Sequence, residues 1–103
     1  MRRGVVIVIY DDYQLLDLAG PVDVFSVASL IAGDGGYAVE VVAARAGEVR
    51  AASGVTTTVR TALADVAGPV DTLMVAGGLG VFDHLGDREL IDGVARLAAT
   101  ARR

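Results

Sequence analysis

An isolated aspartate, Asp17, is the residue whose sequence neighbours most favour a catalytic or binding role. It lies in the segment 15–18 (Leu-Leu-Asp-Leu), shortly after the apolar run 4–9. A carboxylate among apolar neighbours, near the carboxyl end of a parallel strand, is partly desolvated, so its pKa rises and it can donate or accept a proton. The alternative is an exposed loop acid that caps a helix beginning at Gly20-Pro21. The residue types leave both interpretations open.

A glycine-rich loop at 77–80 (Gly-Gly-Leu-Gly) follows the apolar segment 71–76. Glycines such as Gly77 and Gly78 let the backbone turn sharply and present N–H groups to an anion. The spacing matches neither a dinucleotide-binding fingerprint nor a P-loop. A plain tight turn and an oxyanion hole are both compatible with this loop.

The other polar residues favour structural roles. Asp11 and Asp12 follow the first apolar run and are typical turn formers, and Ser53 is a turn residue of a predicted hairpin. The single histidine, His84, precedes the last predicted helix and has no obvious acid partner in the sequence. Neither a metal site nor a cofactor is predicted, because the histidine and the scattered aspartates lack ligand spacing.

Composition excludes several classes of protein. The formal net charge is −4, every basic residue is arginine, and the basic residues form no cluster larger than the pairs Arg2-Arg3 and Arg102-Arg103, so direct binding to nucleic acid is not expected. With no cysteine there is no disulfide, thiolate metal site or cysteine nucleophile. No segment reaches the roughly 18 consecutive apolar residues of a membrane span, and the acids after the first run argue against a signal peptide. We expect a cytoplasmic location.

The elements around these residues follow from hydrophobic periodicity. The uninterrupted Val/Ile pattern of residues 4–10 predicts a central parallel strand covered on both faces. A helix is predicted from Pro21, which suits a first helical position, to about Ala32, with Asp23 in its first turn and glycines at its end. This helix is apolar around most of its circumference. It is therefore either deeply sandwiched or also part of a subunit interface.

Further elements alternate along the chain. A second strand is predicted at Tyr37 to Ala43, a hairpin at 46–50 and 55–59, and a short helical turn at 62–66. Asp71 to Ala76 is the next buried strand, and a last helix runs from about Asp87, its cap, to Ala101.

This order predicts an α/β fold with a mostly parallel, doubly wound sheet. Right-handed crossovers place the first strand between the second strand and the 71–76 strand. Such a sheet normally continues beyond its third parallel strand, so the outer edge of the 71–76 strand would be open and prone to pairing. Residues 1–103 are therefore interpreted as half of a domain.

Three segments resemble the opening of the ThiJ/PfpI superfamily of class I glutamine amidotransferase-like domains. They are 6–10 with 15–25, Ala-Ser-Gly-Val at 52–55, and Val-Ala-Gly-Gly-Leu-Gly at 75–80, in the order that the family shows. The resemblance covers nearly the whole chain. It is greatest to the sensor domain of GlxA-type, AraC-family transcription regulators, and bacterial isonitrile hydratases open similarly.

The resemblance implies a flavodoxin-like three-layer sandwich, usually in a homodimer with the first helix near the subunit contact. It also implies that the acid at Asp17 hydrogen-bonds a cysteine on a nucleophile elbow. The backbone N–H of Gly78 would help to form the oxyanion pocket, so Asp17, Gly77 and Gly78 are the expected catalytic or ligand-binding residues. The strand that delivers the cysteine would follow the helix ending near Arg103, and so would any helix-turn-helix domain.

Three functions are therefore compatible with the sequence. The leading hypothesis is a ligand-sensing or dimerisation module of a regulator, catalytically incomplete as it stands. The alternative is part of an isonitrile hydratase- or amidotransferase-like enzyme, and the third is a structural protein that closes its sheet edge by self-association. The expected partners are a second copy, through the first helix and the open edge, and a small-molecule ligand.

Overall fold

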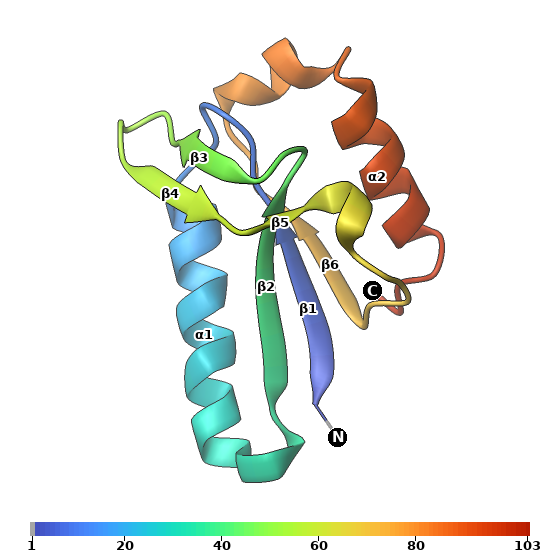
Figure 1. The fold of residues 1–103 in the computed structure, drawn as a ribbon. Helices are drawn as coiled ribbons and strands as arrows, with labels where there is room; N and C mark the ends of the chain where they lie inside the picture. Colours follow the sequence, from blue (N-terminus) through green and yellow to red (C-terminus); the bar gives the residue numbers. More distant parts are fainter. Residues whose placement is uncertain (1) are drawn as a thin grey trace.

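A four-stranded parallel sheet forms the centre of the molecule (Figure 1). The structure is a computed structural model that describes residues 2–103, apart from the side chain of Asp34. The sheet order is β5-β2-β1-β6. The bounds are Arg3–Val8 for β1, Tyr37–Ala43 for β2, Thr61–Ala62 for β5 and Thr72–Val75 for β6. The predicted central position of the first strand is confirmed.

The core is built on β1, whose apolar run is buried from Val5 to Tyr10. Its register pairs Val5 with Val39 of β2 and with Thr72 of β6, so both edges of β1 are hydrogen-bonded. A strand with both edges paired and both faces covered needs apolar side chains on each side, which explains the absence of polar alternation in its sequence.

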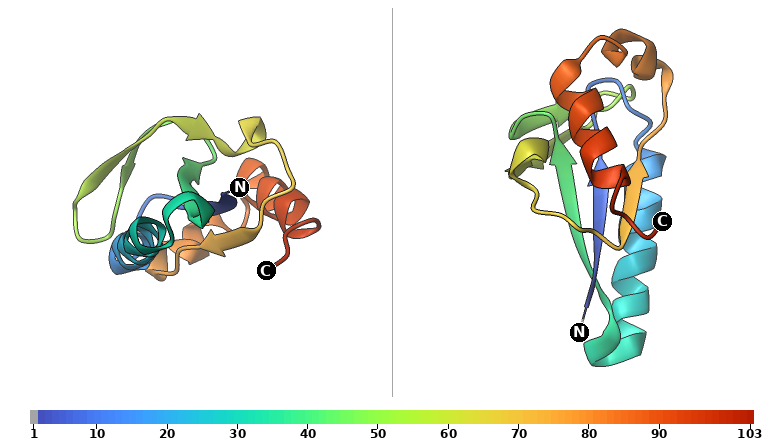
Figure 2. Two further views of the ribbon diagram at one scale, coloured as in Figure 1. Left: turned by 90° about the horizontal axis from the view of Figure 1, so that it is seen from below. Right: turned by 90° about the vertical axis from the view of Figure 1, so that its right-hand side faces the viewer.

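Two helices cover opposite faces of the sheet, which gives three layers (Figure 2). Helix α1 (Leu16–Ala32) packs on the face that carries Tyr37, with the rings of Phe25 and Tyr37 4.8 Å apart. Helix α2 (Arg88–Ala98) lies on the other face, where Leu90 and Leu97 are buried. The predicted α/β fold with a mostly parallel sheet is confirmed.

The predicted hairpin forms a separate two-stranded sheet of β3 (Gly47–Arg50) and β4 (Thr56–Val59). It is tied to the loop after β1 rather than to the main sheet. The amide of Ala52 donates to the carbonyl of Tyr13 over 2.9 Å, and the Tyr13 hydroxyl lies 2.9 Å from Oγ1 of Thr57. Tyr13 is fully buried, so the hairpin fixes the path of the chain between β1 and α1.

The start of α1 differs from the prediction. The helix begins at Leu16, so Pro21 lies inside it, and Asp17 rather than Asp23 is the acid of the first turn. The first turn is closed by short-range bonds, such as the one from the amide of Leu18 to the carbonyl of Leu15. Pro21 is the sixth residue of the helix, beyond the first turn in which a proline costs little, so it removes the hydrogen bond to the carbonyl of Asp17 and the packing of α1 on the sheet must offset that cost. The preference of proline for the first helical position therefore does not determine where this helix begins.

Three further differences concern short elements. The two-residue strand β5 was not predicted, and it adds a fourth parallel strand outside β2. The 3₁₀ helix η3 (Leu79–His84) occupies the segment expected to be a loop. Helix α2 ends at Ala98, three residues before the predicted end, while its predicted cap Asp87 is confirmed by a 3.2 Å bond from the amide of Leu90.

Helix α1 leaves an apolar face uncovered. Leu30 and Ile31 are 81% and 83% exposed, and Val24 and Val27 are also exposed. The alternative of a deeply sandwiched helix is therefore wrong for the described residues. Neither α1 nor α2 combines the length and the hydropathy that a membrane-spanning helix requires.

Candidate functional site

Asp17 joins the first turn of α1 to the exit loop of β6. Its Oδ2 accepts a hydrogen bond of 2.8 Å from the amide of Gly77, whose carbonyl in turn accepts one of 2.8 Å from the amide of Gln14. Asp17 is half-buried. The carboxylate is therefore not a free loop acid that caps the helix. It is held at the carboxyl ends of β1 and β6, where the sequence predicted a site.

Gly78 lies next to this contact, in a conformation that requires glycine. Its φ is 131°, and a Cβ on it would lie 2.8 Å from the backbone nitrogen of Gln14. Among the residues that the structure describes, its amide donates to no acceptor. Asp17, Gly77 and Gly78 are thus brought together as the family resemblance implied. An oxyanion role for the Gly78 amide stays a prediction.

Tyr10 is a site residue that sequence reasoning missed. Its side chain is buried, and its hydroxyl donates to the carbonyl of Ala76 over 2.6 Å. Burial raises the pKa of the Tyr10 hydroxyl above its ordinary value, and the negative charge of Asp17 raises it further. The signal available in the sequence was an aromatic residue at the end of the apolar run, directly before two aspartates.

The two aspartates after Tyr10 lie in a turn, as predicted. Asp12 has a φ of 67°, and Oδ1 of Asp11 accepts a 3.1 Å bond from the amide of Arg50. The amide of Asp12 donates to the carbonyl of Arg50 over 2.7 Å. These contacts bind the end of β3 to the loop after β1, which gives Asp11 and Asp12 a structural role.

His84 does have an acid partner, contrary to the sequence-based expectation. Its Nδ1 lies 3.8 Å from Oδ2 of Asp87, and its Nε2 lies 3.1 Å from the carbonyl oxygen of Asp11. The ring also lies tilted against Tyr10, with centroids 5.0 Å apart. The spacing of three residues to the cap of α2 was the signal that could have revealed this pair.

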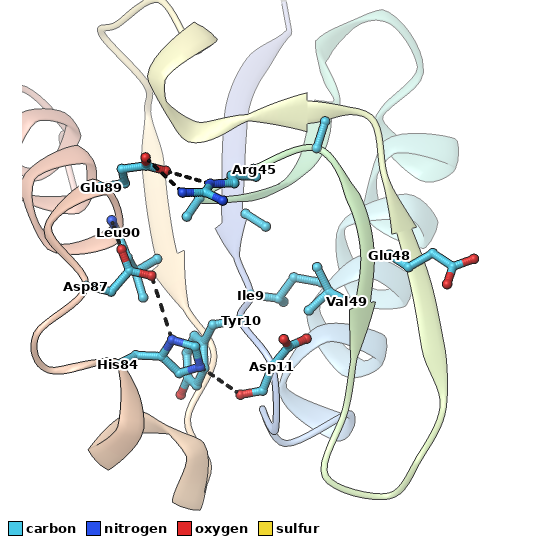
Figure 3. Close-up of a pocket in the computed structure, with 13 residues that line it drawn as sticks. Ile9, Tyr10, Asp11, Arg45, Glu48, Val49, His84, Asp87, Glu89 and Leu90 are labelled. Carbon is cyan, nitrogen blue, oxygen red and sulfur yellow. Dashed lines mark hydrogen bonds and ion pairs between the residues drawn. The ribbon is translucent and has the colours of Figure 1, made fainter.

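A cavity of about 480 Å³ opens at the carboxyl ends of β1 and β2 (Figure 3). The exposed side chains of Arg45 and Glu89 form an ion pair across it, with a shortest distance of 3.3 Å. Asp17, Gly77 and Gly78 do not line it. The lining residues come from the ends of both strands, the hairpin, η3 and the start of α2: Ile9, Tyr10, Asp11, Ala43, Ala44, Arg45, Ala46, Glu48, Val49, His84, Asp87, Glu89 and Leu90.

The cavity and the Asp17 contact are separate features that meet at Tyr10. Tyr10 lines the cavity, while the negative charge of Asp17 contributes to the raised pKa of its hydroxyl. Among the side chains that the structure describes, no three His, Asp or Glu residues come together in an arrangement that could hold a metal ion. The described residues therefore offer a polar cavity beside a fixed carboxylate.

The chain belongs to the DJ-1/PfpI family, whose model matches residues 3–103. An uncharacterized protein in the cpoL 5′ region of Streptomyces lividans is 39% identical over 74 residues, which are 72% of this chain and 50% of that protein. The chain thus spans about half the length of the relative.

Solved structures show the same fold. A ThiJ/PfpI domain protein from Brachyspira murdochii matches with a TM-score of 0.72 and 19% identity, over 94% of this chain and 53% of its own. An AraC family transcriptional regulator from Pseudomonas putida matches with a TM-score of 0.63 and 19% identity, over 75% of this chain and 41% of its own. A DJ-1 superfamily protein from Agrobacterium tumefaciens matches with a TM-score of 0.66 and 16% identity, over 91% of this chain and 46% of its own. At these identities the likeness concerns the fold.

Proposed function

We propose that residues 1–103 form the amino-terminal half of a ligand-sensing and dimerisation module of a DJ-1/PfpI-like transcription regulator of the GlxA/AraC type. Two comparisons support this proposal: the family match and the shared fold with an AraC family regulator. The sequence also contains no cysteine that could act as the family nucleophile. A module of this kind binds and signals, and does not turn over a substrate by itself.

The observation that carries ligand sensing is the cavity at the ends of β1 and β2. Its volume of about 480 Å³ lies in the range of small-molecule sites. It combines an apolar floor at Ile9 and Val49 with the polar side chains of Arg45 and His84. The exposed Arg45–Glu89 ion pair stabilises the fold only slightly. A ligand that replaces Glu89 as the partner of Arg45 therefore loses little binding free energy by breaking this pair.

The test is a thermal-shift screen of the purified chain against small carboxylates, amides and amino acids. We expect at least one compound to raise Tm saturably, because a ligand that binds only the folded state stabilises it. The Arg45→Ala variant should lose this shift. The Arg60→Ala variant, which alters an exposed arginine outside the cavity, should keep it. A shift that is equal in both variants, or none with any compound, contradicts the proposal.

The alternative function is that of an isonitrile hydratase- or amidotransferase-like enzyme, in which Asp17 acts beside a cysteine supplied by another segment. Two features favour this function: the carboxylate fixed on Gly77 and the adjacent amide of Gly78, which has no acceptor among the described residues. The coding sequence that follows codon 103 distinguishes the two. A cysteine elbow followed by two helix-turn-helix motifs indicates a regulator, whereas an elbow followed by a stop codon indicates an enzyme.

A further inference from the structure

One peptide group, the one between Ala76 and Gly77, is held at both ends by side chains from the first segment of the chain. Its carbonyl accepts a 2.6 Å bond from the Tyr10 hydroxyl, and its N–H donates over 2.8 Å to Oδ2 of Asp17. Because a peptide bond is planar and rigid, these two bonds act on a single unit. Tyr10 and Asp17 are therefore linked through this peptide, although their own side chains share no hydrogen bond in the described part of the chain.

The two bonds strengthen each other. A carbonyl that accepts a hydrogen bond draws electron density from its peptide nitrogen, so the N–H of Gly77 becomes a better donor to Asp17. In the other direction, the Asp17 carboxylate makes the carbonyl of Ala76 a better acceptor for Tyr10. The Tyr10 bond is buried and short for its type, and a buried bond is less weakened by solvent.

This chain of bonds fixes one oxygen of the carboxylate. Oδ2 of Asp17 is held by Gly77, whereas Oδ1 accepts no hydrogen bond from the described residues, so Oδ1 is the oxygen that can bind a further group. Gly78 follows directly, with its φ of 131°. The orientation of the Ala76–Gly77 peptide thus sets both the direction of the free carboxylate oxygen and the start of the glycine-rich loop.

Tyr10 also belongs to the cavity. Its ring lines the cavity and packs against His84, with the two centroids 5.0 Å apart (Figure 3). Asp17 and Gly77 do not line the cavity. Among the described lining residues, Tyr10 is the one whose side chain bonds to the Ala76–Gly77 peptide. It is therefore placed to connect the cavity with the carboxylate.

We propose that Tyr10 is a positioning residue: its hydroxyl, acting through the Ala76–Gly77 peptide, sets the strength of the bond that holds Asp17, and contacts made in the cavity change that bond. The second part of this statement rests on the proposed ligand-sensing function, whereas the first part stands without it. Burial raises the pKa of the Tyr10 hydroxyl, so the hydroxyl is uncharged at pH 7. The coupling to Asp17 is then not a force between two charges.

A double-mutant cycle at pH 7 measures this coupling. Tyr10→Phe removes the hydroxyl, Asp17→Ala removes the carboxylate, and urea unfolding gives the stability of both variants and of the double variant. We expect the double variant to lose less stability than the sum of the two single losses, because each bond depends on the other. The control cycle uses Tyr13→Phe, which removes another buried hydroxyl, 2.9 Å from Oγ1 of Thr57, and should be additive.

The Gly77 amide gives a readout that a purely structural role of the Tyr10 ring would not move. In the Tyr10→Phe chain, NMR should show the Gly77 amide proton shifted upfield and its hydrogen exchange faster by about fivefold or more, since its bond to Asp17 is weaker. Tyr13→Phe should leave both quantities unchanged.

The cavity side is tested with His84→Ala, which alters the surroundings of the Tyr10 ring. We expect this change to shift the Gly77 amide resonance. Glu48→Ala is the control, because Glu48 lines the cavity but points away from Tyr10 (Figure 3). In a Tyr10→Phe background, His84→Ala should have little effect on Gly77, since the transmitting hydroxyl is absent. These measurements use no ligand, so their failure is distinct from a failure of the thermal-shift screen.

Three outcomes would overturn the proposal. An additive Tyr10–Asp17 cycle, or an unchanged Gly77 amide in Tyr10→Phe, refutes the positioning role. Equal coupling in the Tyr13 control cycle also refutes it, because the loss would then be a general loosening of the fold. An equal response of Gly77 to His84→Ala with and without the Tyr10 hydroxyl refutes the link to the cavity, since the effect would then travel along η3.

Discussion

Oδ2 of Asp17 accepts the backbone N–H of Gly77 at 2.8 Å, across sixty positions of sequence. This bond closes the end of the sheet at which β1, α1 and β6 meet. In an Asp17→Ala variant the Gly77 amide loses its acceptor, so we expect the free energy of unfolding to fall by about 1 kcal/mol. Urea unfolding measures the change. Asp23→Ala, an exposed change on the same helix, is the control and should have little effect.

The pKa of Tyr10 reports on the same carboxylate. Burial is the larger cause of its rise and Asp17 the smaller one. An Asp17→Asn variant should therefore lower this pKa, yet leave it above the ordinary value of about 10. Stabilisation linked to Tyr10 is fully present below that ordinary value and is lost as the pH rises through the folded-state pKa. An NMR titration assigned with Tyr10→Phe tests this, and an unchanged pKa would place Asp17 too far away to act.

Gly78 supports a prediction about backbone conformation. Its φ of 131° and the 2.8 Å approach of a Cβ to the nitrogen of Gln14 make Gly78→Ala strained, so we expect a loss of about 2 kcal/mol or more. Gly86→Ala is the matched control, because nothing lies within 4 Å of its added Cβ. Chemical denaturation of both variants gives the comparison, and equal stabilities would contradict the described loop.

Acid should weaken the fold partly through Asp71. The Arg102 guanidinium, 2.7 Å away at its nearest, is the main cause that lowers the pKa of Asp71 to about 2. Since the folded-state pKa is below the unfolded one, this stabilisation is present above about pH 4 and is lost as the pH falls toward about pH 2. Asp71→Asn should flatten the pH dependence of Tm in that window. Asp92→Asn, an exposed change on α2, should leave its slope unaltered.

The exposed face of α1 predicts self-association. Leu30 and Ile31 lie on it with more than four fifths of their surface exposed. Placing charge there with Leu30→Glu and Ile31→Glu should shift the chain from dimers toward monomers in sedimentation velocity. Val55→Glu, an equivalent change on the hairpin, is the control. If the unaltered chain sediments as a monomer at every concentration, the interface through α1 is refuted.

Long, strongly patterned elements were predictable from the sequence. The bounds of β2 agree at both ends, and the burial of β1 follows from its unbroken apolar run. The neighbourhood of Asp17 and Gly78 was expected from the family resemblance, and the fold explains it, because the carboxyl ends of parallel strands meet at one edge of a sheet. That part of the site depends on topology, which an alternation of strands and helices largely determines.

The remainder depends on contacts that local patterns do not encode. Pro21 has a strong preference for a helix start, yet the bonds around Leu15 begin the helix earlier. Strand β5 is two residues long and exists only through pairing with β2. The rings of Tyr10 and His84 pack together although the two segments are distant in sequence, so hydrophobic periodicity does not predict their contact.

Gly77 is synthesised sixty positions after Asp17, so the two halves of this contact become available at different times. At roughly 5–20 residues per second, the ribosome needs about 3–12 s to add the intervening chain. During that interval β1 can pair with β2 alone, because β6 has not yet emerged. The nascent chain therefore carries a half-exposed central strand, and its carboxylate at Asp17 stays bound to water until the glycine loop arrives. Until β6 joins the sheet, one edge of this apolar strand is unpaired, and unpaired strand edges favour aggregation.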